Sequence, residues 1–121
     1  MTYIILKIII NAISITIAVK LVNGITFRGE WWKIIIIGAV FGIVNSFIRP
    51  IVKFFTFPLI ILTLGLFTFI INALMLLLTE KLSESFNLGL QIYGFWPAFW
   101  GALIVSIVST ILSWLTFEKG N

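Results

Sequence analysis

The sequence predicts an all-α integral membrane protein, a four-helix bundle made of two tandem two-helix hairpin repeats. Three observations lead to this fold class: the composition, the length of the apolar segments and an internal repeat. The chain is 61% hydrophobic and only 10% charged, with a mean hydropathy of +1.22, whereas soluble domains average about 45 to 50% apolar and 25% charged residues. Eight basic and four acidic side chains are too few to keep such a chain soluble in water, so the bilayer is the expected medium.

The internal repeat is carried by two short matches. The sequence IINA at residues 9–12 recurs at residues 70–73, and the pair Gly38-Ala39 recurs as Gly101-Ala102 with a serine at the same spacing after each pair. The two offsets are 61 and 63 residues, which an insertion of two residues in the second copy explains. An offset kept across two blocks predicts duplication of a two-helix unit. The single membrane domain, 1–121, is then divided into repeat one at about 1–52 and repeat two at about 53–121.

Four segments meet the length of about 20 residues that a helix needs to cross the hydrocarbon core. Pro50 is predicted to end the second segment because proline lacks the amide hydrogen, while Pro58 and Pro97 are tolerated in a first helical turn. Apolar and polar residues alternate weakly at residues 25–27 and 88–92, which predicts a small strand pair at the membrane surface. The predicted spans are about 2–22, 31–49, 57–79 and 96–117.

The membrane topology follows from the repeat. Each repeat contains two crossings, so both copies enter from the same side, as parallel repeats do, and both termini lie on one face. The basic residues divide equally, four to the terminal side and four to the loop side, so the positive-inside rule does not decide the orientation. We favour cytoplasmic termini because Arg49 and Lys53 flank a short turn and three of the four glutamates fall on the other side; dual orientation is the alternative.

The composition argues against several functions. The chain has no His, Cys or Asp, so the usual metal sites, cysteine nucleophiles and Ser-His dyads are excluded. No enzymatic activity, cofactor or small-molecule substrate is predicted. The basic residues are scattered rather than gathered in a patch, which argues against nucleic acid and favours membrane lipid as the partner of helix-end charges.

Three asparagines and one arginine are the polar residues of interest within the spans. Asn11 and Asn72 occupy equivalent positions of the two repeats near mid-bilayer, where an amide needs a hydrogen-bonding partner, and symmetry would let the first and third helices meet there. Asn45 and Arg49 are four residues apart and share a helix face. Interhelical hydrogen bonding and the lining of a pathway are the two interpretations of the asparagines, and a phosphate anchor is the favoured role of Arg49.

Small residues form a second pattern. Gly38, Gly42 and Ser46 follow one another at intervals of four and form a ridge that a neighbouring backbone can approach closely. The fourth span carries a comparable face. This pattern favours packing within the chain over a homo-oligomer, which is the alternative. The residues of that second face are Gly101, Ala102, Ser106 and Ser109.

Several blocks of the chain resemble the four-span phage holin superfamily. They are NSFIRPI at residues 45–51, Pro58-Leu59, TLGLF at residues 63–67, INALM at residues 71–75 and GFWPAFWGALI at residues 94–104. The resemblance implies a small multi-pass protein of the prokaryotic cytoplasmic membrane with no catalytic residue. The name holin implies oligomers that permeabilise the membrane.

Three functions follow as hypotheses. The favoured one is a structural or regulatory envelope bundle that binds lipid or a partner. The alternative is a true holin-like pore former, whose small-residue faces would drive self-association and whose polar positions would line a lesion. A small transporter is the second alternative, and it requires an accessible cavity at the midplane.

Overall fold

The computed structural model describes residues 2–118, which form helices and one small sheet. In chain order the elements are α1 (Thr2–Leu21), β1 (Ile25–Phe27), α2 (Trp31–Ile43), η1 (Val44–Ile48), α3 (Arg49–Phe55), α4 (Phe57–Leu62), α5 (Phe67–Ser85), β2 (Leu90–Ile92), α6 (Phe95–Ser113) and η2 (Trp114–Glu118). Both η1 and η2 are π-helical turns. Among the described residues, three helices are long and apolar enough to cross a membrane: Thr2–Leu21, Trp31–Phe55 and Phe95–Thr116.

The second long helix does not end at Pro50, as the sequence predicts, but continues through η1 and α3 to Phe55. Proline in a helix interior removes one hydrogen bond and clashes with the preceding turn. The wider π-helical turn of η1 ends at Ile48, two residues before Pro50, and such turns commonly accompany a local break in the α-helical hydrogen-bond ladder. Pro50 then stands in the first turn of α3, where its missing amide hydrogen costs little.

The segment 57–79, predicted as one continuous span, consists of α4 and most of α5 with a turn at residues 63–66 between them. Leu64 adopts a left-handed conformation with φ of 57°. The Gly65 N–H donates to the Ile60 carbonyl and the Leu64 N–H donates to the Ile61 carbonyl, which is the Schellman arrangement of a helix end. Within the turn, Gly65 is the residue whose type predicts the end of a helix.

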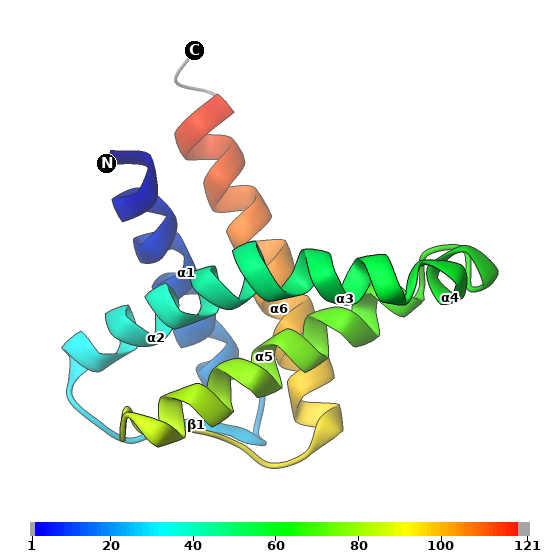
Figure 1. The fold of residues 1–121 in the computed structure, drawn as a ribbon. Coiled ribbons are helices and arrows are strands. Elements are labelled where there is room, and N and C mark those ends of the chain that lie inside the picture. Colours follow the sequence, from blue (N-terminus) through cyan, green and yellow to red (C-terminus); the bar gives the residue numbers. More distant parts are fainter. Residues whose placement is uncertain (1, 119–121) are drawn as a thin grey trace.

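The helices cross one another. Figure 1 shows α1 and α6 running side by side toward the terminal end, while α2–α3 and α5 lie across them. α1 packs on α2 and α6, and α5 packs on α6 and more lightly on α2 and α3. The N-terminal end of α1 and the C-terminal end of α6 lie at one end of the molecule, and the sheet lies at the other.

The predicted strand pair is confirmed. β1 pairs antiparallel with β2, with Thr26 opposite Gln91. The Ile92 N–H donates to Glu80 Oε2 at 2.8 Å, which fastens β2 to α5. The sheet therefore joins the two interhelical loops into one cap over the helix ends opposite the termini.

The main hydrophobic cluster extends to this cap and includes Ile25, Leu90 and Ile92 of the two strands. Gly38 brings the backbones of α1 and α2 together, because a Cβ at this position would lie 2.8 Å from both the Ala12 nitrogen and the Ile8 oxygen. A smaller cluster of Val44, Ile71 and Met75 joins the second long helix to α5. The buried apolar residues of the main cluster are Ile15, Ala18, Ile25, Ile37, Phe41, Ala73, Leu76, Leu88, Leu90, Ile92, Ala98, Ala102 and Val105.

Candidate functional site

A polar cavity of about 270 Å³ lies among α1, α2–α3, α5 and α6. Each of these helices is apolar over most of its length, yet together they direct amides, hydroxyls and two cationic side chains into one space. Polar side chains inside an apolar helical protein are costly and commonly mark functional positions. The lining residues are Lys7, Asn11, Phe41, Gly42, Asn45, Ser46, Arg49, Asn72, Ala102, Val105, Ser106, Ser109 and Thr110.

All three asparagines singled out in the sequence line this cavity. Asn11 is only 5% exposed, and its Nδ2 donates to the Gly38 carbonyl oxygen at 3.4 Å. Its partner is therefore the backbone of α2 and not Asn72, because α1 packs on α2 and α6 rather than along α5. Asn45 and Asn72 reach the same space from the second long helix and from α5.

The small residues singled out in the sequence divide into two groups. Gly42, Ser46, Ala102, Ser106 and Ser109 line the cavity, so that their short side chains leave its volume open.

The other two small residues serve packing. Gly38 accommodates the backbone of α1, and a Cβ at Gly101 would collide with the side chain of Ile25 in β1. The ridge of Gly38, Gly42 and Ser46 thus begins as a helix contact and ends as a cavity wall.

Two positive charges face the cavity. Arg49 is half-buried, and in the described part of the chain its Nε is buried without a hydrogen-bond partner. Lys7 lies one helical turn before Asn11, on the same face of α1, and also lines the cavity. Lys7 is one of the four basic residues that the predicted topology puts on the terminal side, and its spacing of four from Asn11 is the sequence signal of a shared site. No carboxylate is among the lining residues within residues 2–118.

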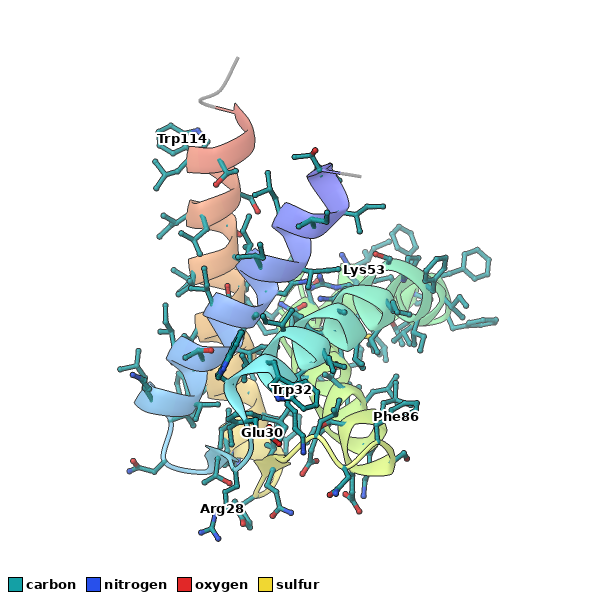
Figure 2. All side chains as sticks on the ribbon, turned by 90° about the vertical axis from the view of Figure 1, so that its left-hand side faces the viewer. Arg28, Glu30, Trp32, Lys53, Phe86 and Trp114 are labelled. Atoms are coloured by element: carbon teal, nitrogen blue, oxygen red, sulfur yellow. The ribbon has the colours of Figure 1, made fainter. Side chains whose placement is uncertain are left out.

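A wider groove of about 560 Å³ adjoins the cavity on the terminal side. It shares Lys7, Ser109 and Thr110 with the cavity and continues past Ser113 to Trp114. The Ser113 hydroxyl is buried and has no partner among the described residues. Figure 2 shows Trp114 near the terminal end of α6, opposite the end where Arg28 and Glu30 lie. The cavity is therefore approached between α1 and α6 from the terminal side, while the apolar core closes it toward the sheet.

This arrangement fits an oxyanion. A positive charge in a low-dielectric region is stabilised by an opposite charge or by hydrogen bonds. Guanidinium and ammonium groups are the usual protein ligands of phosphate oxygens, and asparagine and serine add neutral donors. No lining carboxylate neutralises Lys7 and Arg49. A phosphate group would supply the missing negative charge and would accept hydrogen bonds from the lining donors.

The comparisons with known proteins agree with the fold and the composition. A family described as mycobacterial four-transmembrane-segment phage holin, superfamily IV, matches residues 2–111. The chain is 47% identical over 112 residues to uncharacterized protein SCO3922 of Streptomyces coelicolor, covering 88% of this chain and 90% of that one. It is 38% identical over 79 residues to uncharacterized membrane protein YvlD of Bacillus subtilis, covering 64% of this chain and 63% of that one.

No solved structure matches the chain. The family match covers nearly the whole of the described structure, and its description agrees with the resemblance noted in the sequence. Among the described residues, three helices are long and apolar enough to cross a membrane. The chain is an integral membrane protein that belongs to the mycobacterial four-transmembrane-segment phage holin family, superfamily IV.

Proposed function

We propose that this protein is a non-enzymatic structural or regulatory bundle of the bacterial cytoplasmic membrane that binds the phosphate of an anionic lipid. The observation that supports it is the cavity in which Lys7 and Arg49 face neutral hydrogen-bonding side chains without a carboxylate. The groove between α1 and α6 gives a headgroup a lateral entry, with apolar Ile111 and Trp114 beside it for the acyl chains. An anionic lipid would fill the cationic cavity with its phosphate and the apolar groove with its acyl chains, whereas a free anion would fill only the cavity.

The proposal includes the topology and the origin of the fold. Both termini face the cytoplasm, and the cavity opens to the cytoplasmic leaflet, whose anionic lipids attract basic residues. The two hairpins derive from one duplicated unit. In support, the α1–α2 and α5–α6 pairs are both tightly packed, and the strands β1 and β2, which follow α1 and α5, pair with each other.

A lipid-binding measurement tests the function. Titration of the detergent-solubilised protein with fluorescent phosphatidylglycerol and phosphatidylcholine should show preference for phosphatidylglycerol. Arg49→Ala should weaken phosphatidylglycerol binding tenfold or more, because a hydrogen bond to a charged group contributes about 1.5 to 3 kcal/mol. Arg49→Lys should retain part of the affinity, since it keeps the charge but not the planar fork of donors.

Lys53→Ala is the matched control, because Lys53 is one turn beyond Arg49 in α3 but is not among the cavity-lining residues. It should leave phosphatidylglycerol affinity unchanged. Equal affinity for the two lipids, or equal losses for Arg49→Ala and Lys53→Ala, would exclude the cavity as the lipid site. Inorganic phosphate as competitor distinguishes the sources: binding of phosphate alone, without phosphatidylglycerol binding, would identify a small anion as the ligand.

Pore formation is the second candidate, favoured by the family description. A lesion lined by several copies of the chain needs polar side chains on the outer face of each copy. Here Asn11 is buried and Asn45 and Asn72 line an internal cavity, which argues against a pore. Transport, the third candidate, has the required cavity but needs the core toward the sheet to open.

Liposomes separate these candidates. Reconstituted protein should leave entrapped carboxyfluorescein inside vesicles at protein-to-lipid ratios that give several copies per vesicle. Release of the dye that rises steeply with protein density would overturn the structural function and establish the pore. Uptake of radioactive phosphate without dye release would establish transport.

A further inference from the structure

The family description gives four transmembrane segments. We propose that in this chain the hairpin formed by α2–α3 and α4–α5, which corresponds to the second and third of them, does not cross the bilayer. Instead it enters from the side of the sheet, turns within the hydrocarbon and returns to the same side, as a re-entrant hairpin whose tip is embedded in lipid acyl chains. The hairpin tip is defined as residues 54–66. Either arrangement begins and ends the hairpin on the sheet side, so the placement of the termini is unaffected, and the inference does not depend on the cavity or its ligand.

The first observation is the chemistry of the hairpin tip. No charged residue occurs between Lys53 and Glu80. A turn that had crossed the bilayer would lie among headgroups and water, where polar residues are the rule for turns. The hairpin tip instead presents large apolar side chains to its surroundings. Its exposed apolar residues are Phe54, Phe55, Phe57, Leu59, Ile61, Leu62, Leu64 and Leu66.

The second observation is that the turn satisfies its own backbone. Every N–H from Thr63 to Phe69 donates to an acceptor within the hairpin: Thr63 to the Leu59 carbonyl, Leu64 to Ile61, Gly65 to Ile60, Leu66 to Thr63, Thr68 to Gly65, Phe69 to Leu66, and Phe67 to the Thr63 hydroxyl oxygen. The Thr63 hydroxyl in turn donates to the Leu59 carbonyl at 2.8 Å. A turn in water can leave such groups to the solvent, whereas in hydrocarbon they must be paired internally. This turn meets the stricter requirement.

The third observation is a comparison of two helix ends of the same type. At the end of α5, Asn87 has φ of 55° and the Leu88 N–H donates to the Ser83 carbonyl; at the end of α4, Leu64 and Gly65 form the same Schellman arrangement. Asparagine is the non-glycine residue that best tolerates this conformation, and it stands at the end that faces water. Leu64 stands at the hairpin tip with 93% of its surface exposed, at a conformational cost of about 1 to 2 kcal/mol. Burial in acyl chains offsets that cost.

The fourth observation is the position of the hairpin tip along the molecule. α1 is 20 residues long, which gives about 30 Å and spans the hydrocarbon core. Figure 1 shows α4 level with the middle of α1 rather than with its N-terminal end, and far out to the side of α6. Figure 2, turned about the same vertical axis, keeps Lys53 well below the level of Trp114. When α1 and α6 cross the bilayer, the hairpin tip therefore lies within it.

The two cations of α3 agree with this placement. Arg49 and Lys53 are four residues apart and share one face; Arg49 lines the polar cavity and Lys53 is half-buried. Neither charge is presented to lipid as a fully exposed side chain. The long stem of Lys53 lets its ammonium extend away from the surrounding acyl chains.

The chain has no cysteine, so single-cysteine variants of the full-length protein test the inference directly. The variants are Leu64→Cys at the hairpin tip, Asn87→Cys on the sheet side and Thr2→Cys on the terminal side. A membrane-impermeant maleimide should label Cys at 87 from one side of native membranes and Cys at 2 from the other. Cys at 64 should be labelled from neither side, and should react after detergent solubilisation.

A nitroxide spin label at the same three positions in reconstituted bilayers then measures depth. The label at 64 should have high collision rates with oxygen and low rates with a water-soluble nickel chelate, which places it deeper than the labels at 2 and 87. Maleimide labelling at 64 from the Thr2 side would show that the hairpin crosses and would overturn the inference. Low collision rates with both reagents would also overturn it, because they would show that a second copy of the chain, and not lipid, covers the hairpin tip.

Discussion

Replacing Gly38 by valine is expected to prevent assembly of α1 on α2. A Cβ at residue 38 would lie 2.8 Å from the Ala12 nitrogen and the Ile8 oxygen, and backbone atoms of a packed helix cannot move aside as the end of a flexible side chain can. Overpacking a tight contact costs about 1 to 3 kcal/mol, and valine adds two further methyl groups. We expect the protein to be degraded in cells or to elute as aggregates after heating to temperatures that leave the natural chain monodisperse.

Gly38→Ala and Gly42→Ala form a graded control pair for this experiment. Alanine gains about 1 kcal/mol of helix propensity over glycine, which offsets part of the clash at residue 38. At Gly42 the nearest atom to an added Cβ is the terminal Asn11 Nδ2 at 3.2 Å, and that amide can rotate. Gly42→Ala should therefore be neutral or stabilising, and Gly38→Ala destabilising. Equal thermal stability of the two alanine variants would contradict the close approach of α1 and α2.

Placing a carboxylate in the cavity is expected to have the largest effect on function. Ser106 lines the cavity together with Lys7 and Arg49. Ser106→Asp supplies the two cations with an internal counterion and repels a phosphate group. Phosphatidylglycerol affinity should fall more than tenfold while thermal stability stays the same or rises, because the paired charges no longer need an external partner.

Ser106→Asn is the matched control, since it has nearly the same shape as aspartate without the charge. It should keep most of the lipid affinity. A loss of affinity that is equal in the two variants would assign the effect to shape and would count against charge recognition in the cavity. Unchanged affinity in Ser106→Asp would place the lipid elsewhere on the protein.

The sequence predicted the solvent, the family resemblance and the strand pair, and the comparisons and the structure confirm these. Composition was sufficient for the first, because the few charged groups cannot cover so apolar a chain in water. The strand pair was predicted from weak alternation of apolar and polar residues at 25–27 and 88–92, and β1 and β2 lie within these stretches. The long apolar helices α1 and α6 correspond closely to the first and fourth predicted spans.

The second and third predicted spans differ from the observed helices because residue preferences alone did not predict where each helix ends. Pro50 breaks an α-helix locally, but a π-helical turn before it lets the helix continue. Residues 63–66 contain only Gly65 as a helix breaker, yet Leu64 adopts the left-handed conformation there. In both places the backbone departs from what intrinsic preference favours, since hydrogen bonding within the hairpin and packing against neighbouring helices outweigh a preference of about 1 kcal/mol per residue.

The amino-acid sequence by itself determined which medium the chain occupies and which polar residues it carries into that medium. Only the tertiary structure decided that Asn11, Asn45, Asn72 and Arg49 share one cavity with Lys7 and that Asn11 donates to the Gly38 carbonyl. Helical periodicity fixes the face on which each residue lies, whereas the partner of that face depends on how the helices cross. That crossing is set by contacts distant in sequence, such as the approach of Gly38 to the backbone of α1.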